Sequence, residues 1–481
     1  MKLFALERDK VEIGAIINSD TLPTPLVSNE SNNIDKDFVA FEKHIDAFNS
    51  LNTVYDQVSS EAFSFIDRGN YVLYNEYIKT LTSNLGMSHV PVISQEAMDT
   101  LPTVAVNHHI SLEGFIGDMW AKIMGLFRKI ADAVKEFFTK YFTRLGRLKN
   151  KLNNLLEVLK ETNKDISTLQ LDKVPGGLAS KYPINGKINL STIQETFTNI
   201  SALGMILKNI NENASALAKK DILDRDFVSK IKSLKDIAKN SKEKIEQNNA
   251  NKGLNPLSQK NRDLRSDNSN LKNTIKDAEK QSKEEEGKVS EITGDAANAN
   301  IEFDDQEFTA AKKEFETLIA AVNLDLGKLK GKQLVGGVTI TSVAVSKEGV
   351  LELETNTDKE TPDQVDLTSK SDLIKLIEST IKLITEVEGL SKKYGEINDT
   401  ISKSMDTVDK IIKDIDAIKA ENLGKYKSVL TNKVKERLSL LKNFFTNYNK
   451  VCKSLFGMVL DAADGNVEYT VLCLKYFGDS K

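Results

Sequence analysis

The feature that most constrains the fold is a long amphipathic pattern that begins at Gly114. Apolar side chains recur there every three or four positions, which places them on one face of a helix. Between residues 114 and 151, nine lysines and arginines stand against three acids. We therefore expect one long, basic, amphipathic helix over residues 114–170. The recurring apolar residues are Ile116, Trp120, Ile123, Phe127, Ile130, Val134, Phe137, Tyr141, Leu145, Leu148, Leu152, Leu155 and Leu159.

Most of the remaining sequence also has helical spacing, with two exceptions. Residues 246–300 are rich in Asn, Lys, Ser and Glu, which indicates a solvated coiled-coil arm or a disordered chain. Residues 333–356 alternate with a period of two around a Ser-Lys-Glu-Gly turn, which is typical of a β-hairpin. The sequence therefore predicts a mainly α fold, an elongated helical bundle or coiled-coil body with one small β-hairpin insertion.

Composition and breaks in the pattern divide the chain into five regions. The first region combines a small helical unit with an exposed connector at residues 88–112, which contains two prolines and no sustained period. The regions are an acidic, propeptide-like N-terminal region (1–113), the long basic helix (114–170), a helical body with the polar arm at about 246–300 (171–330), the hairpin (331–360) and C-terminal helices (361–481).

The charge changes sign at Glu113. Of 66 basic and 70 acidic residues in the chain, 7 and 16 lie in residues 1–113, so this region carries −9 and the rest carries +5. All four histidines also lie before this point. A balance of +5 over so long a chain is not by itself typical of a nucleic-acid-binding protein. Removal of residues 1–113 would, however, turn an acidic chain into a mildly basic one.

The sequence contains none of the motifs that commonly carry catalysis. It lacks a Walker-type glycine-rich loop, H-E-x-x-H, CxxC and G-x-S-x-G. His108 and His109 are adjacent, so in a strand or loop they point apart, whereas a zinc site needs three or four converging ligands. We expect Cys452 and Cys473 to be core cysteines on two helices that pack as a hairpin across residues 461–465. The sequence thus predicts a protein that is not an enzyme, with no metal and no cofactor.

Nothing in the sequence predicts a membrane-spanning helix or a secretory signal. Acidic residues interrupt any apolar stretch within the first ten positions, and no run of about 18 uncharged apolar residues occurs.

Tripeptides of the form small-x-Glu are concentrated before Gly114. Six of the eight glutamates in residues 1–113 have Ser or Ala two positions earlier, against three of the twenty-seven that follow. A leader made for removal would carry several such sites, and a mature body would be spared them. Two sites lie in the connector, Ser94-Gln95-Glu96 followed by Ala97 and Ser111-Leu112-Glu113 followed by Gly114. The others are Ala5-Leu6-Glu7, Ser28-Asn29-Glu30, Ala40-Phe41-Glu42 and Ser59-Ser60-Glu61.

On these tripeptides and the amphipathic segment after them, the chain resembles the internal head proteins of large (jumbo) tailed bacteriophages. The resemblance covers roughly residues 90–150. It implies a precursor that a prohead protease cuts after Glu113 or Glu96, and a structural virion protein of the capsid interior that is assembled in the host cytoplasm. It further implies contacts with other virion proteins and non-specific contact with packaged DNA. In one form of this hypothesis, the protein is also ejected with that DNA.

The apolar face of residues 114–145 leaves two other interpretations open. Flanked by lysines, this face suits either packing in a bundle or contact with a membrane surface. A membrane-active helical bundle of the pore-forming or ejection type is therefore one alternative, and a cytoplasmic coiled-coil scaffold that needs no cleavage is the other. The residues of this packing or membrane face are Phe115, Trp120, Phe127, Phe137, Phe138 and Phe142.

Overall fold

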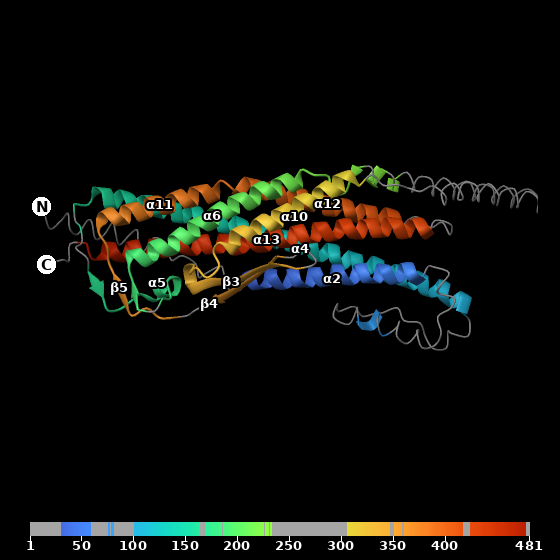
Figure 1. The fold of residues 1–481 in the computed structure, drawn as a ribbon, viewed down its shortest axis with the longest axis horizontal. Coiled ribbons are helices and arrows are strands. Elements are labelled where there is room, and N and C mark those ends of the chain that lie inside the picture. The colour runs from blue at the N-terminus through green and yellow to red at the C-terminus, as the bar shows by residue number, and fades with distance from the viewer. Residues whose placement is uncertain are drawn as a thin grey trace, which may run out of the picture.

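The computed structural model forms an elongated bundle of long helices with a small sheet at one end (Figure 1). The mainly α fold expected from the sequence is confirmed. The helices are α2 (Glu30–Val58), α4 (Leu101–Glu161), α5 (Gly176–Lys181), α6 (Leu190–Ala218), α10 (Gln306–Gly327), α11 (Lys370–Glu388), α12 (Ser391–Asp416) and α13 (Gly424–Lys475). The structure describes residues 30–58, 76, 78–80, 101–163, 165, 169–184, 186–225, 227–229, 231–232, 305–346, 351–357, 360–416 and 424–477.

Helix α4 is longer at its N-terminus than the apolar pattern suggests. It begins at Leu101, so residues 101–112 are helical, and our prediction that they belong to a connector between helices is wrong. Pro102 is compatible with this because a proline in the first turn of a helix removes no hydrogen bond. The helix ends at Glu161 rather than at residue 170, and the chain then enters strand β1 (Gln170–Leu171).

The apolar stripe of α4 lies in the core of the bundle. All thirteen of its 3–4-spaced residues, from Ile116 to Leu159, are buried. The stripe is covered by α2, α11, α12 and α13. The periodicity of the sequence therefore identified the buried face of this helix correctly, because burial of apolar surface drives helix packing.

Helix α13 is the central helix of the bundle. It contacts α2, α4, α6, α11 and α12 and is buried on most sides between Leu438 and Leu474. It runs without a break through residues 461–465, so the helical hairpin that we expected there is wrong. Cys452 and Cys473 consequently lie on one helix, and both are buried, as expected for core cysteines.

A buried arginine ties α13 to the start of α10. The Arg437 side chain is fully buried, and its guanidinium lies 4.2 Å from the ring centre of Phe227 and 4.5 Å from that of Phe308. Its Nη2 donates to Asp305 Oδ1 at 2.6 Å. Burial by itself raises the pKa of Asp305, but hydrogen bonds from Lys433 and Arg437 outweigh it and lower the pKa below its usual value. The carboxylate is thus the counter-charge of a desolvated cation.

Two small β elements complete the described fold. Strands β3 (Val338–Val345) and β4 (Leu351–Thr357) pair antiparallel, which confirms the predicted hairpin. A second sheet, which the sequence did not predict, has the strand order β1–β5–β2, with β5 at Gln364–Asp366 and β2 at Lys187–Ile188. Its strands are two or three residues long, too short to show a period. The polar arm predicted at residues 246–300 lies outside the described residues.

Candidate functional site

The tripeptides singled out in the sequence fall in different places. Ser111, Leu112, Glu113 and Gly114 lie inside helix α4, about three turns after its start. Proteases cut exposed, extended chain, so the helical hydrogen bonds around Glu113 must open before the bond is cut. The tripeptide Ala40-Phe41-Glu42 lies within α2. Ser94, Gln95, Glu96 and Ala97 lie outside the described residues, as do residues 5–7 and 59–61.

The aromatic face of α4 packs against its neighbours. Trp120, Phe127, Phe137 and Phe138 are buried, and Phe142 is partly buried against the core, while the side chain of Phe115 lies outside the described set. Ring centres lie 5.0 Å apart for Phe48–Trp120, 3.9 Å for Phe138–Tyr394 and 5.5 Å for Phe142–Phe456. In this fold the face is covered, and a membrane could reach it only if the helices separated. Within the described part of the chain, no helix is long and apolar enough to cross a membrane.

Trp120 is held on both sides. Its indole Nε1–H donates to Asp409 Oδ1 on α12 at 2.9 Å, while its ring contacts Phe48 on α2. Asp409 also accepts from Lys413 at 2.8 Å. Burial raises the pKa of Asp409, but the hydrogen bonds from Lys413 and Trp120 outweigh it and lower the pKa overall. The indole is thereby fixed as part of the surface on which α2 lies.

Helix α2 belongs to the core of the bundle, although it lies in the N-terminal region that we expected to be separate. Its apolar residues are spaced three and four apart, the seam typical of two helices packed side by side. The helix runs antiparallel to α4, since Phe48 lies beside Trp120 and Phe41 beside Phe127 (Figure 1). The buried seam of α2 consists of Ile34, Phe38, Phe41, Ile45, Phe48 and Leu51.

Four acids of α2 pair with four lysines of α4 and α13. Two of these lysines, Lys442 and Lys453, are themselves buried, with side chains 8% exposed. Burial lowers the pKa of Lys453, and its hydrogen bond with Asp35 offsets part of this effect. The N–O distances are 2.8 Å for Lys129–Asp37, 2.8 Å for Lys442–Asp46, 3.2 Å for Lys450–Glu42 and 2.5 Å for Lys453–Asp35. The acidic balance of the N-terminal region thus has specific partners on the basic part of the chain.

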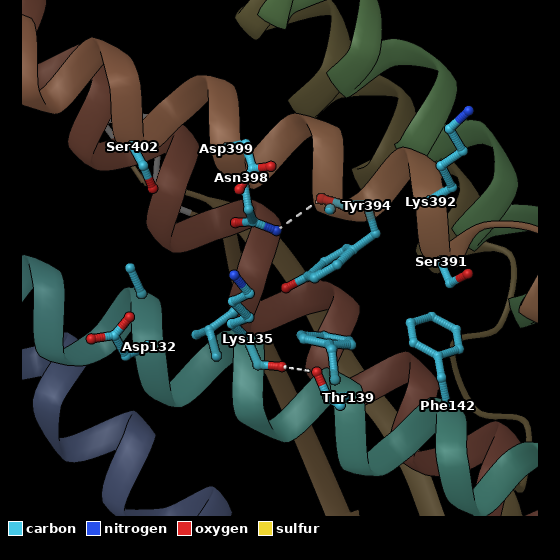
Figure 2. A pocket seen from close by; sticks show the side chains of 14 residues that line it. Asp132, Lys135, Thr139, Phe142, Ser391, Lys392, Tyr394, Asn398, Asp399 and Ser402 are labelled. Atoms are coloured by element: carbon cyan, nitrogen blue, oxygen red, sulfur yellow. Dashed lines mark hydrogen bonds between the residues drawn. The ribbon is translucent and has the colours of Figure 1, made fainter.

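A groove of about 450 Å³ lies between α4 and α12 (Figure 2). Three of its polar side chains bond within the bundle: Thr139 Oγ1 donates to the carbonyl of Lys135 at 2.8 Å, Asn398 Nδ2 donates to the carbonyl of Tyr394 at 3.1 Å, and the Tyr394 hydroxyl donates to Asn449. The lining holds no histidine or cysteine. Its charged side chains are Asp132, Lys135, Lys392 and Asp399.

The other candidate reactive groups, two cysteines and two histidines, lie within the long helices α13 and α4. Burial raises the pKa of the Cys452 thiol and raises that of Cys473 to about 11, which keeps both protonated near neutrality. Residues 108 and 109 lie in α4, and their side chains are not among those described. Among the described residues, no group of three or more His, Cys, Asp or Glu could hold a metal ion.

Comparison with known proteins gives a match at the level of a family. The model of the family described as phiKZ-like phage internal head proteins matches residues 45–460. No curated protein matches, and no solved structure matches. The matched range runs from the second half of α2 to the last third of α13 and so includes most of the bundle.

Proposed function

The chain belongs to the phiKZ-like phage internal head proteins and is a structural protein of the virion, located inside the capsid, and we propose that it is made as a precursor and cut during head assembly. The proposed agent is a prohead protease that cuts after Glu113, or after Glu96, in the small-x-Glu tripeptides. The product of the cut after Glu113 is the body, which we define as residues 114–481.

The concentration of small-x-Glu tripeptides before Gly114 carries this proposal. The described buried stripe of α4 begins at Ile116 and continues to Leu159. A cut after Glu113 would leave the stripe from Ile116 to Leu159 on the body. The cost is the opening of the first turns of the helix, which are its least stable part because helix ends fray.

Charge supports a second part of the proposal, which concerns the packaged DNA. An internal head protein associates with other components of the virion. The precursor carries −4 and the body +5, so cutting removes a net repulsion from the phosphate backbone. We propose weak, non-specific DNA contact by the body, a structural rather than enzymatic role, and ejection with the DNA as a further step. The covered face of α4 gives no support to a membrane-active function.

The N-terminus of the protein in purified particles tests the proposed cleavage. N-terminal sequencing or mass spectrometry is expected to find a chain that begins at Gly114 or Ala97. The Glu113→Gln, Glu96→Gln double variant should accumulate the longer form, and the precursor expressed without phage proteins is the uncut control. An intact Met1 in the particles would contradict the proposal. Ejection is tested by following the labelled protein into the host cell after adsorption.

A further inference from the structure

The place of α2 in the core raises the question of where this helix goes after such a cut. We infer that the body carries a binding groove for an acidic amphipathic helix, and that α2 stays bound in it as a separate, non-covalent piece. We define this α2 groove by Trp120, Lys129 and Phe127 on α4 and by Phe445 and three lysines on α13. The inference rests on the proposed cleavage for its setting in the phage.

Aromatic contacts form the floor of the α2 groove. Phe445 and Phe127 lie 4.9 Å apart, and Phe38 and Phe41 of α2 lie 5.5 Å and 6.1 Å from Phe445. Phe38, Phe41, Ile45 and Leu51 are fully buried. If α2 left the groove, its apolar side chains and the rings of Phe127 and Phe445 would be exposed to solvent. Burial of large apolar side chains is the main favourable contribution to helix association, so it holds α2 in place without a covalent link.

Charge selects the occupant of the groove. Residues 30–58 contain six acids and two lysines, and four of the acids pair with Lys129, Lys442, Lys450 and Lys453. Two empty grooves from two copies would bring four lysines against four lysines, and such like-charge contact opposes association. A helix that fits must be acidic and carry a 3–4-spaced apolar seam. Helix α2 has both properties and is already seated.

The bound helix also conceals one of the small-x-Glu sites. In Ala40-Phe41-Glu42, Phe41 is fully buried and Glu42 accepts a hydrogen bond from Lys450 at 3.2 Å. A protease therefore cannot bind this segment in extended form while α2 occupies the groove. Glu30 and Glu61 stand on either side of the buried seam. Cuts after both would yield residues 31–61 as one piece that retains all six seam residues.

An engineered cut in the full chain tests the inference without the phage protease. A recognition sequence for a site-specific protease is inserted after residue 90, and the chain is expressed in cells that lack phage proteins. After complete cutting, size-exclusion chromatography at micromolar concentration is expected to show the N-terminal fragment eluting with the rest of the chain. Separate elution of the fragment, with the helical circular dichroism of the remainder preserved, would overturn the inference.

A matched pair of variants assigns retention to the α2 groove. Phe41→Ala removes a buried ring and is expected to weaken retention more than about a hundredfold. Val39→Ala changes a side chain on the same helix that is 44% exposed and is expected to leave retention unchanged. Equal retention of the two variants would overturn the assignment.

A charge variant covers the case in which Phe41→Ala does not fold. Glu42→Gln with Asp46→Asn removes two of the four ion pairs, and rising salt should release this fragment before the parent fragment because it is bound more weakly and salt also screens the two partly exposed pairs that remain. Identical salt dependence would count against the role of the lysines. An intact Met1 in particles would overturn only the proposed cleavage, whereas a free fragment after the engineered cut would overturn only this inference.

Discussion

Helix opening around Glu113 is the step that the structure predicts to limit cleavage there, and two glycines of α4 allow it to be tested. Gly117 and Gly125 are both exposed, and a methyl group added at either one would meet no atom within 4 Å. Gly117 lies three residues after Gly114, inside the segment that a protease must hold extended. Gly125 lies beyond the buried Trp120 and Ile123, so fraying that exposes Glu113 need not reach it.

The size of the effect follows from helix propensity. Replacing an exposed glycine in a helix interior by alanine stabilises the helix by about 1 kcal/mol. Where opening and closing are fast relative to cutting, the cleavage rate follows the population of the open form. Gly117→Ala is therefore expected to slow cleavage after Glu113 by about fivefold, since 1.4 kcal/mol corresponds to a factor of ten. Gly125→Ala is expected to leave this rate close to that of the parent.

The assay is limited digestion of the purified precursor with a glutamate-specific endopeptidase, with the fragment that ends at Glu113 quantified by mass spectrometry. In full denaturant that the protease tolerates, all three chains should be cut at the same rate, which separates helix opening from sequence preference. A Gly117→Ala chain cut as fast as the parent would refute the requirement for opening through this turn. Equal slowing by Gly125→Ala would show that the whole bundle unfolds before the cut.

Three further variants test α13 and its contact with Asp305. Asp305→Asn should lower the free energy of unfolding by about 3–5 kcal/mol in urea titrations, because it leaves the desolvated Arg437 without its counter-charge. Since the pKa of Asp305 is lowered in the fold, its contribution is present above the ordinary carboxyl pKa and is lost as pH falls towards the lowered value; the variant should lose that dependence. Gly457→Ala should raise stability by about 0.5–1 kcal/mol because the added methyl meets nothing within 4 Å. Gly465→Ala should instead lower it by about 1–3 kcal/mol, since the methyl would lie 3.0 Å from the buried ring of Tyr182; equal thermal midpoints for these two glycine variants would contradict this.

Features with a local period were predictable along the chain. The apolar stripe from Ile116 to Leu159 identified the buried face of α4, and the alternation around residues 338–357 identified the hairpin. The connector before Gly114 was only partly predictable, because Pro102 is read as a break unless it is known to lie in the first turn of a helix. Cys452 and Cys473 were correctly expected in the core, although the helix that carries them was wrongly divided.

The candidate site was likewise predictable only in part from the sequence. The tripeptides ending at Glu96 and Glu113 can be recognised from the sequence alone, and so can the acidic excess before Gly114. That Glu113 lies within a helix, and that Asp46 pairs with Lys442 almost four hundred residues away, are not readable from either pattern. The sequence of α2 did contain a usable pattern, because its apolar seam and its acids are those of a helix that packs against a basic partner. This pattern does not identify α4 and α13 as the partners of α2.

The sequence by itself determined that the fold is mainly helical, which face of α4 is apolar and where the charge changes sign, because periodicity and composition are properties of neighbouring residues. The tertiary structure alone decided that α2 lies against α4 and α13, that Arg437 is buried between two rings, and that the aromatic face of α4 meets protein. The physical reason is that an apolar stripe specifies burial without specifying its partner. The partner is chosen by the shape and charge of surfaces that exist only after the helices have packed.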